Sequence, residues 1–175
     1  LATTDGGPMR SVILQNITIE GVDNPMLIRL GNRLSGSGTR QGYASDSDHL
    51  QGVQGTQVGV PLTPDLQLED VIIQNLTARD VGPYPAIVAG IPNHPVRRIT
   101  LRDITIVASR SGTKADLETQ PSWKADMYPS RLMFKTCLPA FGLATAFTED
   151  LKVENFKASP AHGEIRPPRW DARLR

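Results

Sequence analysis

Two arginines and an asparagine lie within five positions of one another, at the end of a largely apolar segment spanning residues 25–31. They are Arg29, Asn32 and Arg33. A guanidinium group presents its N–H donors in a planar fork and can hold a carboxylate through two parallel hydrogen bonds. We therefore interpret these three residues as a candidate binding site for an acidic group, with solvated surface side chains as the alternative.

Further along the chain, two carboxylates lie beside an imidazole. Asp46 and Asp48 would share one face of an extended segment next to His49. Such a group could act as an acid/base pair or bind a cation. The many Gly and Ser residues around it favour a solvated loop instead. His94 precedes Pro95 in a predicted turn, where a structural hydrogen bond is a better interpretation than catalysis.

Three other side chains could take part in chemistry or binding. Cys137 is the only cysteine, which excludes a disulfide within the chain, and we expect it to be buried as a small hydrophobic residue. Trp123 and Trp170 could stack against sugars, but no surrounding pattern supports this, and isolated tryptophans usually pack. We expect both tryptophans to pack.

Composition limits the possible partners. The 175 residues include 19 basic and 18 acidic side chains, so no nucleic-acid partner is implied. No apolar run approaches the roughly 20 residues that span a membrane. No carboxylate cluster of the kind that binds Ca²⁺ lies on a predicted strand, so we expect neither a metal nor a cofactor.

One short pattern occurs four times and determines the predicted fold. Its centres are Asn16, Asn75, Asp103 and Asn155, with apolar residues four and two positions before each centre and one and three positions after it. Strict alternation up to the centre indicates a β-strand. Beyond the centre the phase slips by one residue, so the chain must bend to keep both halves facing one interior.

Stacking of the four copies would bring their central residues together. We predict an interior ladder of Asn16, Asn75, Asp103 and Asn155, in which neighbouring amides satisfy one another. Asn16 and Asn75 also begin Asn-x-Thr sequences. An interior position would make them unreachable, so we do not expect glycosylation there.

A second, shorter apolar unit accompanies the first, at residues 25–31, 85–90 and 140–147. One coil would then contain a bent double strand, a turn and a short third strand. Residues 32–67 and 109–138 are rich in Gly, Ser, Pro and charge, which is typical of insertions. The sequence therefore predicts one all-β domain, residues 1–175, folded as a parallel β-helix of about three to four coils with two long loop insertions.

Three segments carry a family resemblance. Residues 11–33, residues 90–106, which contain Ile91-Pro-Asn-His-Pro95, and residues 138–156, followed by Arg166-Pro167, resemble the polygalacturonases of glycoside hydrolase family 28. The resemblance covers nearly the whole chain and is weakest over residues 34–67. It implies a right-handed parallel β-helix and a polygalacturonase-like enzyme that hydrolyses glycosidic bonds in pectic polysaccharide.

The family's catalytic motifs are Asn-Thr-Asp, Asp-Asp, Gly-His-Gly and Arg-Ile-Lys. Their carboxylates protonate the leaving oxygen and activate water, with inversion at the sugar carbon. None of the four occurs here, and Ala161-His162-Gly163 lies too late in the chain to match. The resemblance thus implies the C-terminal part of such an enzyme, whose catalytic residues lie upstream. We expect the chain alone to be inactive.

The resemblance also implies an acidic pectic polysaccharide or oligosaccharide as the partner. Family members often place an Asp-Gln-x-Tyr-like stretch at the end of the short strand, whereas this chain has Arg29-Leu30-Gly31-Asn32. Arg29, Asn32 and Arg33 are thus the candidate contacts, without the aromatic ring. A secreted or periplasmic protein is implied, monomeric if the chain is complete.

Residues 1–11 are polar and too short to cover an end coil, which favours a piece of a longer chain. The alternative function is a non-catalytic β-helix module for glycan binding or adhesion.

Overall fold

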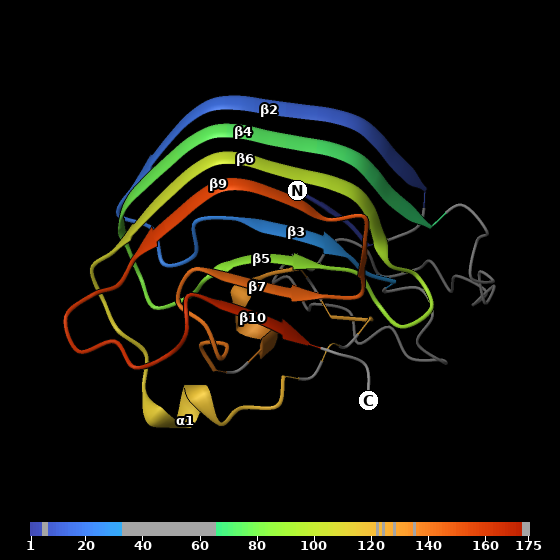
Figure 1. The fold of residues 1–175 in the computed structure, drawn as a ribbon. Coiled ribbons are helices and arrows are strands. Elements are labelled where there is room, and N and C mark those ends of the chain that lie inside the picture. The colour runs from blue at the N-terminus through green and yellow to red at the C-terminus, as the bar shows by residue number, and fades with distance from the viewer. Residues whose placement is uncertain are drawn as a thin grey trace, which may run out of the picture.

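The protein is all-β and contains two parallel sheets, shown in Figure 1. A computed structural model describes residues 1–4, 7–32, 66–121, 123, 125–127, 129–134 and 136–172. One sheet, the short-strand sheet, contains in order β1 (Ala2–Thr3), β3 (Leu27–Leu30), β5 (Ala86–Ala89), β7 (Leu143–Ala146) and β10 (Arg169–Ala172). The other, the long-strand sheet, contains β2 (Pro8–Glu20), β4 (Gln67–Val81) and β6 (Val96–Ala108), with β8 (Thr148–Glu149) and β9 (Lys152–Ser159) both paired to β6.

The four copies of the sequence pattern lie side by side in the long-strand sheet. Position for position, Leu14 pairs with Ile73, Ile73 with Leu101, and Leu101 with Val153. The chain returns to the short-strand sheet between successive copies, so neighbouring strands in either sheet are parallel. The repeat in the sequence is therefore the unit that stacks in the structure.

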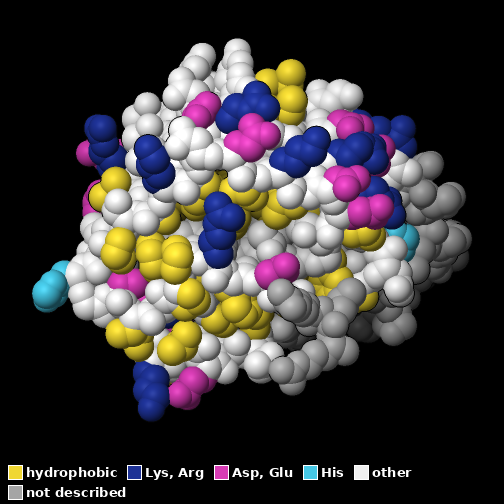
Figure 2. All heavy atoms as spheres, in the orientation of Figure 1, with side chains coloured by type: hydrophobic (Ala, Val, Ile, Leu, Met, Phe, Trp, Pro, Cys, Tyr) yellow, Lys and Arg dark blue, Asp and Glu magenta, His cyan; other side chains and the backbone are white. Residues whose placement is uncertain are grey.

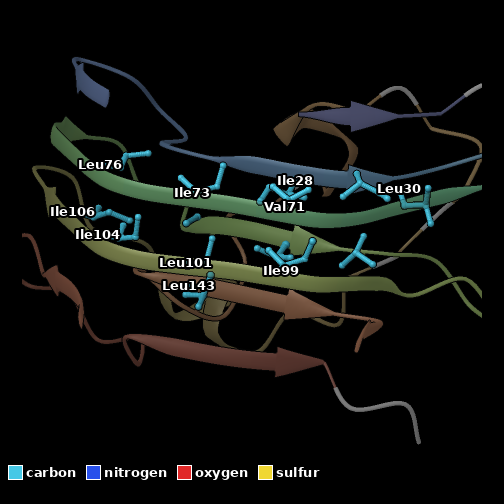
Figure 3. Packing of buried hydrophobic residues seen from close by; sticks show 14 of the residues in the cluster. Ile28, Leu30, Val71, Ile73, Leu76, Ile99, Leu101, Ile104, Ile106 and Leu143 are labelled. Atoms are coloured by element: carbon cyan, nitrogen blue, oxygen red, sulfur yellow. The ribbon is translucent and has the colours of Figure 1, made fainter. Parts of the chain in front are cut away.

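The apolar positions of the repeat fill the space between the sheets (Figure 3). Val71 and Ile99 from the long strands and Ile28 and Leu30 from β3 are completely buried there. Because successive strand residues point to opposite faces, β5 contributes Ala86 and Val88 to this interior and Ile87 and Ala89 to the other side of its sheet.

Described residues of the 109–138 segment, among them Trp123, Met127, Met133, Phe134 and Leu138, pack against that other side of the short-strand sheet. This segment includes α1 (Lys114–Leu117) and a 3₁₀ helix, η2 (Arg131–Phe134). Its Met133 and Phe134 are buried in a second apolar cluster with Ile87 and Ala89. This predicted insertion therefore supplies the apolar cover of the sheet.

The long strands bend where the sequence predicted a bend, and at a second repeated position. All four pattern centres have φ between 47° and 58°, in the left-handed region that Asn and Asp tolerate better than most residues. Five positions earlier, the same conformation recurs at equivalent places that the sequence did not mark. These are Ser11, Asp70, Arg98 and Asp150.

The predicted short strands are present as β3, β5 and β7, whereas β1, β8, β10 and both helices were not predicted. The first predicted insertion, with Asp46, Asp48 and His49, lies almost wholly outside the described residues. Within the described parts of the chain, no helix is long and apolar enough to cross a membrane.

Candidate functional site

The central residues of the repeat form contacts between neighbouring strands, but on the outside of the protein. Asn75 Nδ2 donates to Asn16 Oδ1 at 2.7 Å, and Asn155 Nδ2 donates to Asp103 Oδ1 at 2.6 Å. All four side chains are exposed. The prediction of an interior ladder is wrong, because the bend turns two consecutive residues of each copy outward and the interior positions on either side are already apolar.

Asn16 and Asn75 also begin the two Asn-x-Thr sequences. Their side chains are accessible, so burial gives no reason against modification. Each amide is nevertheless part of the hydrogen bond between β2 and β4, beside a second bond from Gln74 Nε2 to Gln15 Oε1 at 2.9 Å. These amides are thus structural links between strands.

Arg29 is completely buried in β3, so the interpretation as a solvated surface arginine is wrong. It pairs in register with Ala2 and Ala89, and its Nη1 donates to the Gly90 carbonyl. Burial lowers the pKa of its guanidinium to about 10, because the charged form loses hydration. The side chain is therefore held within the protein.

Of the other two predicted binding residues, the structure describes Asn32 alone. Asn32 is 6% exposed, and its backbone N–H donates to the Ala125 carbonyl at 2.6 Å. Arg33 lies outside the described residues. Of the two that the structure describes, Arg29 and Asn32, neither lies at an accessible surface.

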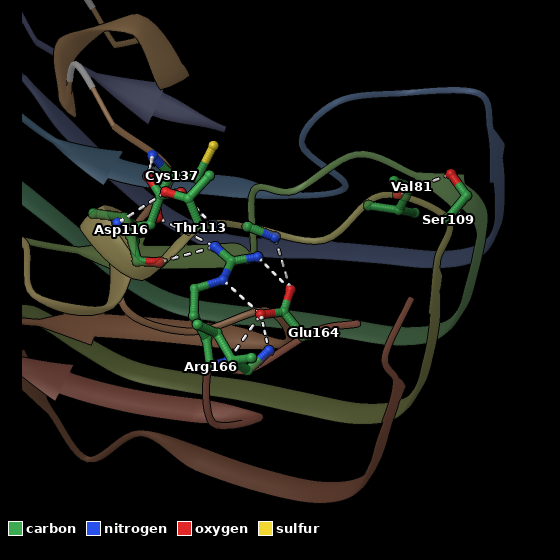
Figure 4. Close-up of polar contacts among 10 residues, drawn as sticks. Val81, Ser109, Thr113, Asp116, Cys137, Glu164 and Arg166 are labelled. Carbon is green, nitrogen blue, oxygen red and sulfur yellow. Dashed lines mark hydrogen bonds and ion pairs between the residues drawn. The ribbon is translucent and has the colours of Figure 1, made fainter. Parts of the chain in front are cut away.

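A buried ion pair lies where residues 109–138 meet the C-terminal segment (Figure 4). Arg166 Nη2 and Glu164 Oε2 are 2.7 Å apart, and both side chains are completely buried. Arg166 Nη1 donates to the Cys137 and Leu138 carbonyls, at 3.2 and 3.0 Å. Gly112 N donates to Glu164, and a Cβ atom at position 112 would overlap the Arg166 guanidinium.

Two opposing effects set the ionisation of Glu164. Burial by itself raises the pKa of this carboxyl, but the hydrogen bonds from Arg166 and from the Gly112 N–H outweigh it. The net result is a pKa of about 2, so the pair is ionised over the physiological range. Nearby, Asp116 accepts from the Cys137 N–H at 2.8 Å and caps α1 together with Thr113. These buried polar contacts connect three segments of the chain and therefore have a structural role.

Charged side chains also cross between the long strands on the outer surface, where Figure 2 shows basic and acidic groups side by side. Arg98 contacts Asp70 at 2.6 Å and Glu69 at 2.9 Å, and Arg102 contacts Glu154 at 2.6 Å. The hydrogen bond from Arg98 lowers the pKa of Asp70. These exposed pairs connect neighbouring strands and leave little net charge for a ligand.

An open groove of about 600 Å³ lies along the turns that leave the long-strand sheet. Asp23 lies between two guanidinium groups, 2.9 Å from Arg110 Nη2 and 2.6 Å from Arg131 Nη2. The Arg131 guanidinium lies over the Tyr84 ring at 5.0 Å. The remaining lining residues are Pro83, Ser109, Ser111 and His162. Sequence reasoning missed this groove because its residues come from separate irregular connections that share no periodicity.

The remaining predictions have mixed outcomes. Trp123 and Trp170 pack as expected, stacked on each other with ring centroids 6.1 Å apart. The backbone of His94 bridges to Ile91 in a turn, as expected of a structural residue. Cys137 is half-buried instead of buried. Within the described residues, no group of three or more His, Cys, Asp or Glu side chains could hold a metal ion.

Comparison of the chain with protein-family models, with curated proteins and with solved structures gives no match.

Proposed function

We propose that the two sheets form a right-handed parallel β-helix of three to four coils carrying two long loop insertions. The alternation of the chain between the sheets and the in-register stacking of the repeat support this proposal. A parallel crossover between strands of one sheet is right-handed in nearly all proteins, which supports the hand.

We further propose that the chain is the C-terminal portion of a polygalacturonase-like glycoside hydrolase acting on pectic polysaccharide. The resemblance of residues 11–33, 90–106 and 138–156 supports the choice of enzyme, and the unequal burial of one repeat position supports a further coil beside β2. Leu14 in the end strand β2 is 39% exposed, whereas its equivalents Ile73 and Leu101 are 2% and 0% exposed. A further coil stacked on β2 would bury Leu14, just as the neighbouring strands bury Ile73 in β4 and Leu101 in β6.

In this proposal, the missing chemistry belongs to the coils beyond β2. There, one carboxylic acid would protonate the glycosidic oxygen, and a carboxylate would activate water on the opposite face of the sugar ring. The present chain would supply the stacked base of the enzyme and part of its glycan-binding surface. No catalytic residue is assigned to it.

The test compares two proteins in a reducing-end assay with polygalacturonate. One is the 175-residue chain, and the other is extended at its N-terminus by the residues that its gene encodes upstream. We expect turnover from the extended protein alone, with Asp-Asp and Gly-His-Gly motifs in the added part. Hydrolysis by the short chain would contradict the proposal. An unrelated or absent upstream segment would instead favour the non-catalytic glycan-binding module.

A further inference from the structure

We propose that the groove between Arg110 and Arg131 binds the carboxylate of an acidic sugar within an oligosaccharide. The inference deepens the function proposed above and rests on it for the choice of a glycan. It places the binding residues on the turns beside the long-strand sheet, away from the buried Arg29.

The charges in the groove favour an anion. Both oxygens of Asp23 are engaged, Oδ1 with Arg110 Nη2 and Oδ2 with Arg131 Nη2. One carboxylate thus fixes two guanidinium groups, which leaves an excess of one positive charge among the Asp and Arg side chains that line the groove. Each guanidinium has five N–H donors and can donate to a second carboxylate beside Asp23. The Arg110 side chain is 56% exposed, so a ligand can reach it.

The other side chains of the groove favour a sugar over a simple ion. Ser111 and His162 line the groove with groups that can exchange hydrogen bonds with ring hydroxyls. Pro83 and Tyr84 provide an apolar wall. A volume of about 600 Å³ falls within the range of small-molecule sites and accommodates at least one sugar unit.

The groove is held in place before any ligand arrives. Gly82 N donates to the Val22 carbonyl at 2.8 Å, and Ser109 N donates to the Val81 carbonyl at 2.9 Å. A Cβ atom at position 82 would lie 2.7 Å from the Asp23 Cα, so the two turns are in close contact. Ser109 Oγ also donates to Asp80, which steadies the turn that carries Arg110. Preorganised donors reduce the entropy cost of binding.

The experiment is a calorimetric titration of the protein with trigalacturonate, and with its methyl ester as a ligand of equal size without the charges. The test variant is Arg110→Ala, which removes an exposed guanidinium. The matched control is Arg102→Ala, whose side chain is 48% exposed and makes one ion pair, to Glu154. Circular dichroism and the melting temperature of each variant verify the fold.

We expect the protein to bind trigalacturonate and to bind the methyl ester at least tenfold more weakly. Arg110→Ala should weaken trigalacturonate binding about tenfold, as expected for one charged hydrogen-bonded contact, and Arg102→Ala less than twofold. Absence of binding, equal affinity for acid and ester, or equal effects of the two variants would each overturn the inference.

The outcome is separable from that of the proposed function. Hydrolysis by the extended protein together with unchanged binding by Arg110→Ala would remove the groove and leave the enzyme proposal intact. Binding that Arg110→Ala weakens, together with no hydrolysis by the extended protein, would support the groove and contradict the enzyme proposal.

Discussion

At the scale of single residues, the buried pair of Glu164 and Arg166 has the largest expected effect on stability. Glu164→Gln leaves the Arg166 charge buried without its counterion and should lower the free energy of unfolding by about 3–5 kcal/mol. Glu154→Gln is the matched control, because Glu154 makes one exposed pair with Arg102 and its loss should cost less than about 1 kcal/mol. Urea unfolding at pH 7 measures both, and equal losses would show that burial of the pair is unimportant.

The same pair predicts a pH dependence. The pKa of Glu164 is about 2 in the folded protein, against an ordinary value of 4.5 in the unfolded chain. The unfolded state therefore takes up a proton first as the pH falls. The stabilisation by this carboxylate is complete above about pH 5 and decreases toward pH 2. Urea midpoints from pH 7 to pH 2.5 should fall more steeply for the wild type than for Glu164→Gln, and parallel curves would contradict the assignment.

The exposed pattern centres at the bends of the long strands give a prediction about backbone conformation. Asn75 has a φ of 52°, where a Cβ atom is unfavourable unless a local hydrogen bond compensates. Asn75→Ala should therefore be less stable than Asn75→Gly by about 1 kcal/mol, although both lose the bond to Asn16. Thr77, two positions later in the same strand, serves as the control, since glycine should be the worse replacement in an ordinary extended segment. Thermal unfolding of the four variants decides whether the order reverses between the two positions.

At the scale of elements, identical positions in successive strands should differ in their energetic importance. Leu101 in β6 is completely buried, whereas Leu14 occupies the same position in the end strand β2 and is 39% exposed. Leu101→Ala should cost about 3 kcal/mol and Leu14→Ala about 1 kcal/mol. In the extended protein proposed above, the cost of Leu14→Ala should rise toward that of Leu101→Ala. Denaturant titrations of both proteins measure this, and an unchanged Leu14→Ala value would argue against a coil on β2.

Much of the long-strand sheet could be predicted because its apolar residues recur at fixed positions in the repeat. Apolar residues two positions before and one position after Asn16 specify which side chains face the interior, and the pairing of β2 with β4 follows. The same pattern explains why the interior ladder was wrong, since Gln15 and Asn16 lie between two inward positions and must both point outward. The bend at Arg98, five positions before the pattern centre, could not be predicted from the sequence, because arginine rarely adopts a positive φ.

The short-strand sheet and the groove were less predictable, because their contacts join segments with no common period. Arg29 shares a face of β3 with Leu27, which packs against the cluster of Met133 and Phe134. The polar composition of residues 109–138 did not indicate that part of this segment packs there. Asp23, Arg110 and Arg131 meet only because connections that follow different strands lie along one edge of the long-strand sheet. No spacing within the sequence brings those three side chains together.

At the scale of the whole molecule, the two ends of the stack differ. The β2 end exposes Ile13 and Leu14, at 61% and 39% of their surfaces. At the opposite end, Val153 of β9, at the position equivalent to Leu14, is half-buried, and Arg169 lies over the Phe156 ring at 5.5 Å. The greater exposure of Leu14 favours a further strand stacked on the β2 side.

Equivalent positions of the repeat stack in parallel register around one apolar interior, and the rest of the fold depends on this stacking. Methyl–methyl nuclear Overhauser effects in a protein labelled at Ile, Leu and Val test it most directly. Stacking in this register predicts cross-peaks between Ile73 and Leu101 and between Leu76 and Ile104, which are paired and almost completely buried. The absence of both, with cross-peaks joining positions one residue out of register, would contradict it.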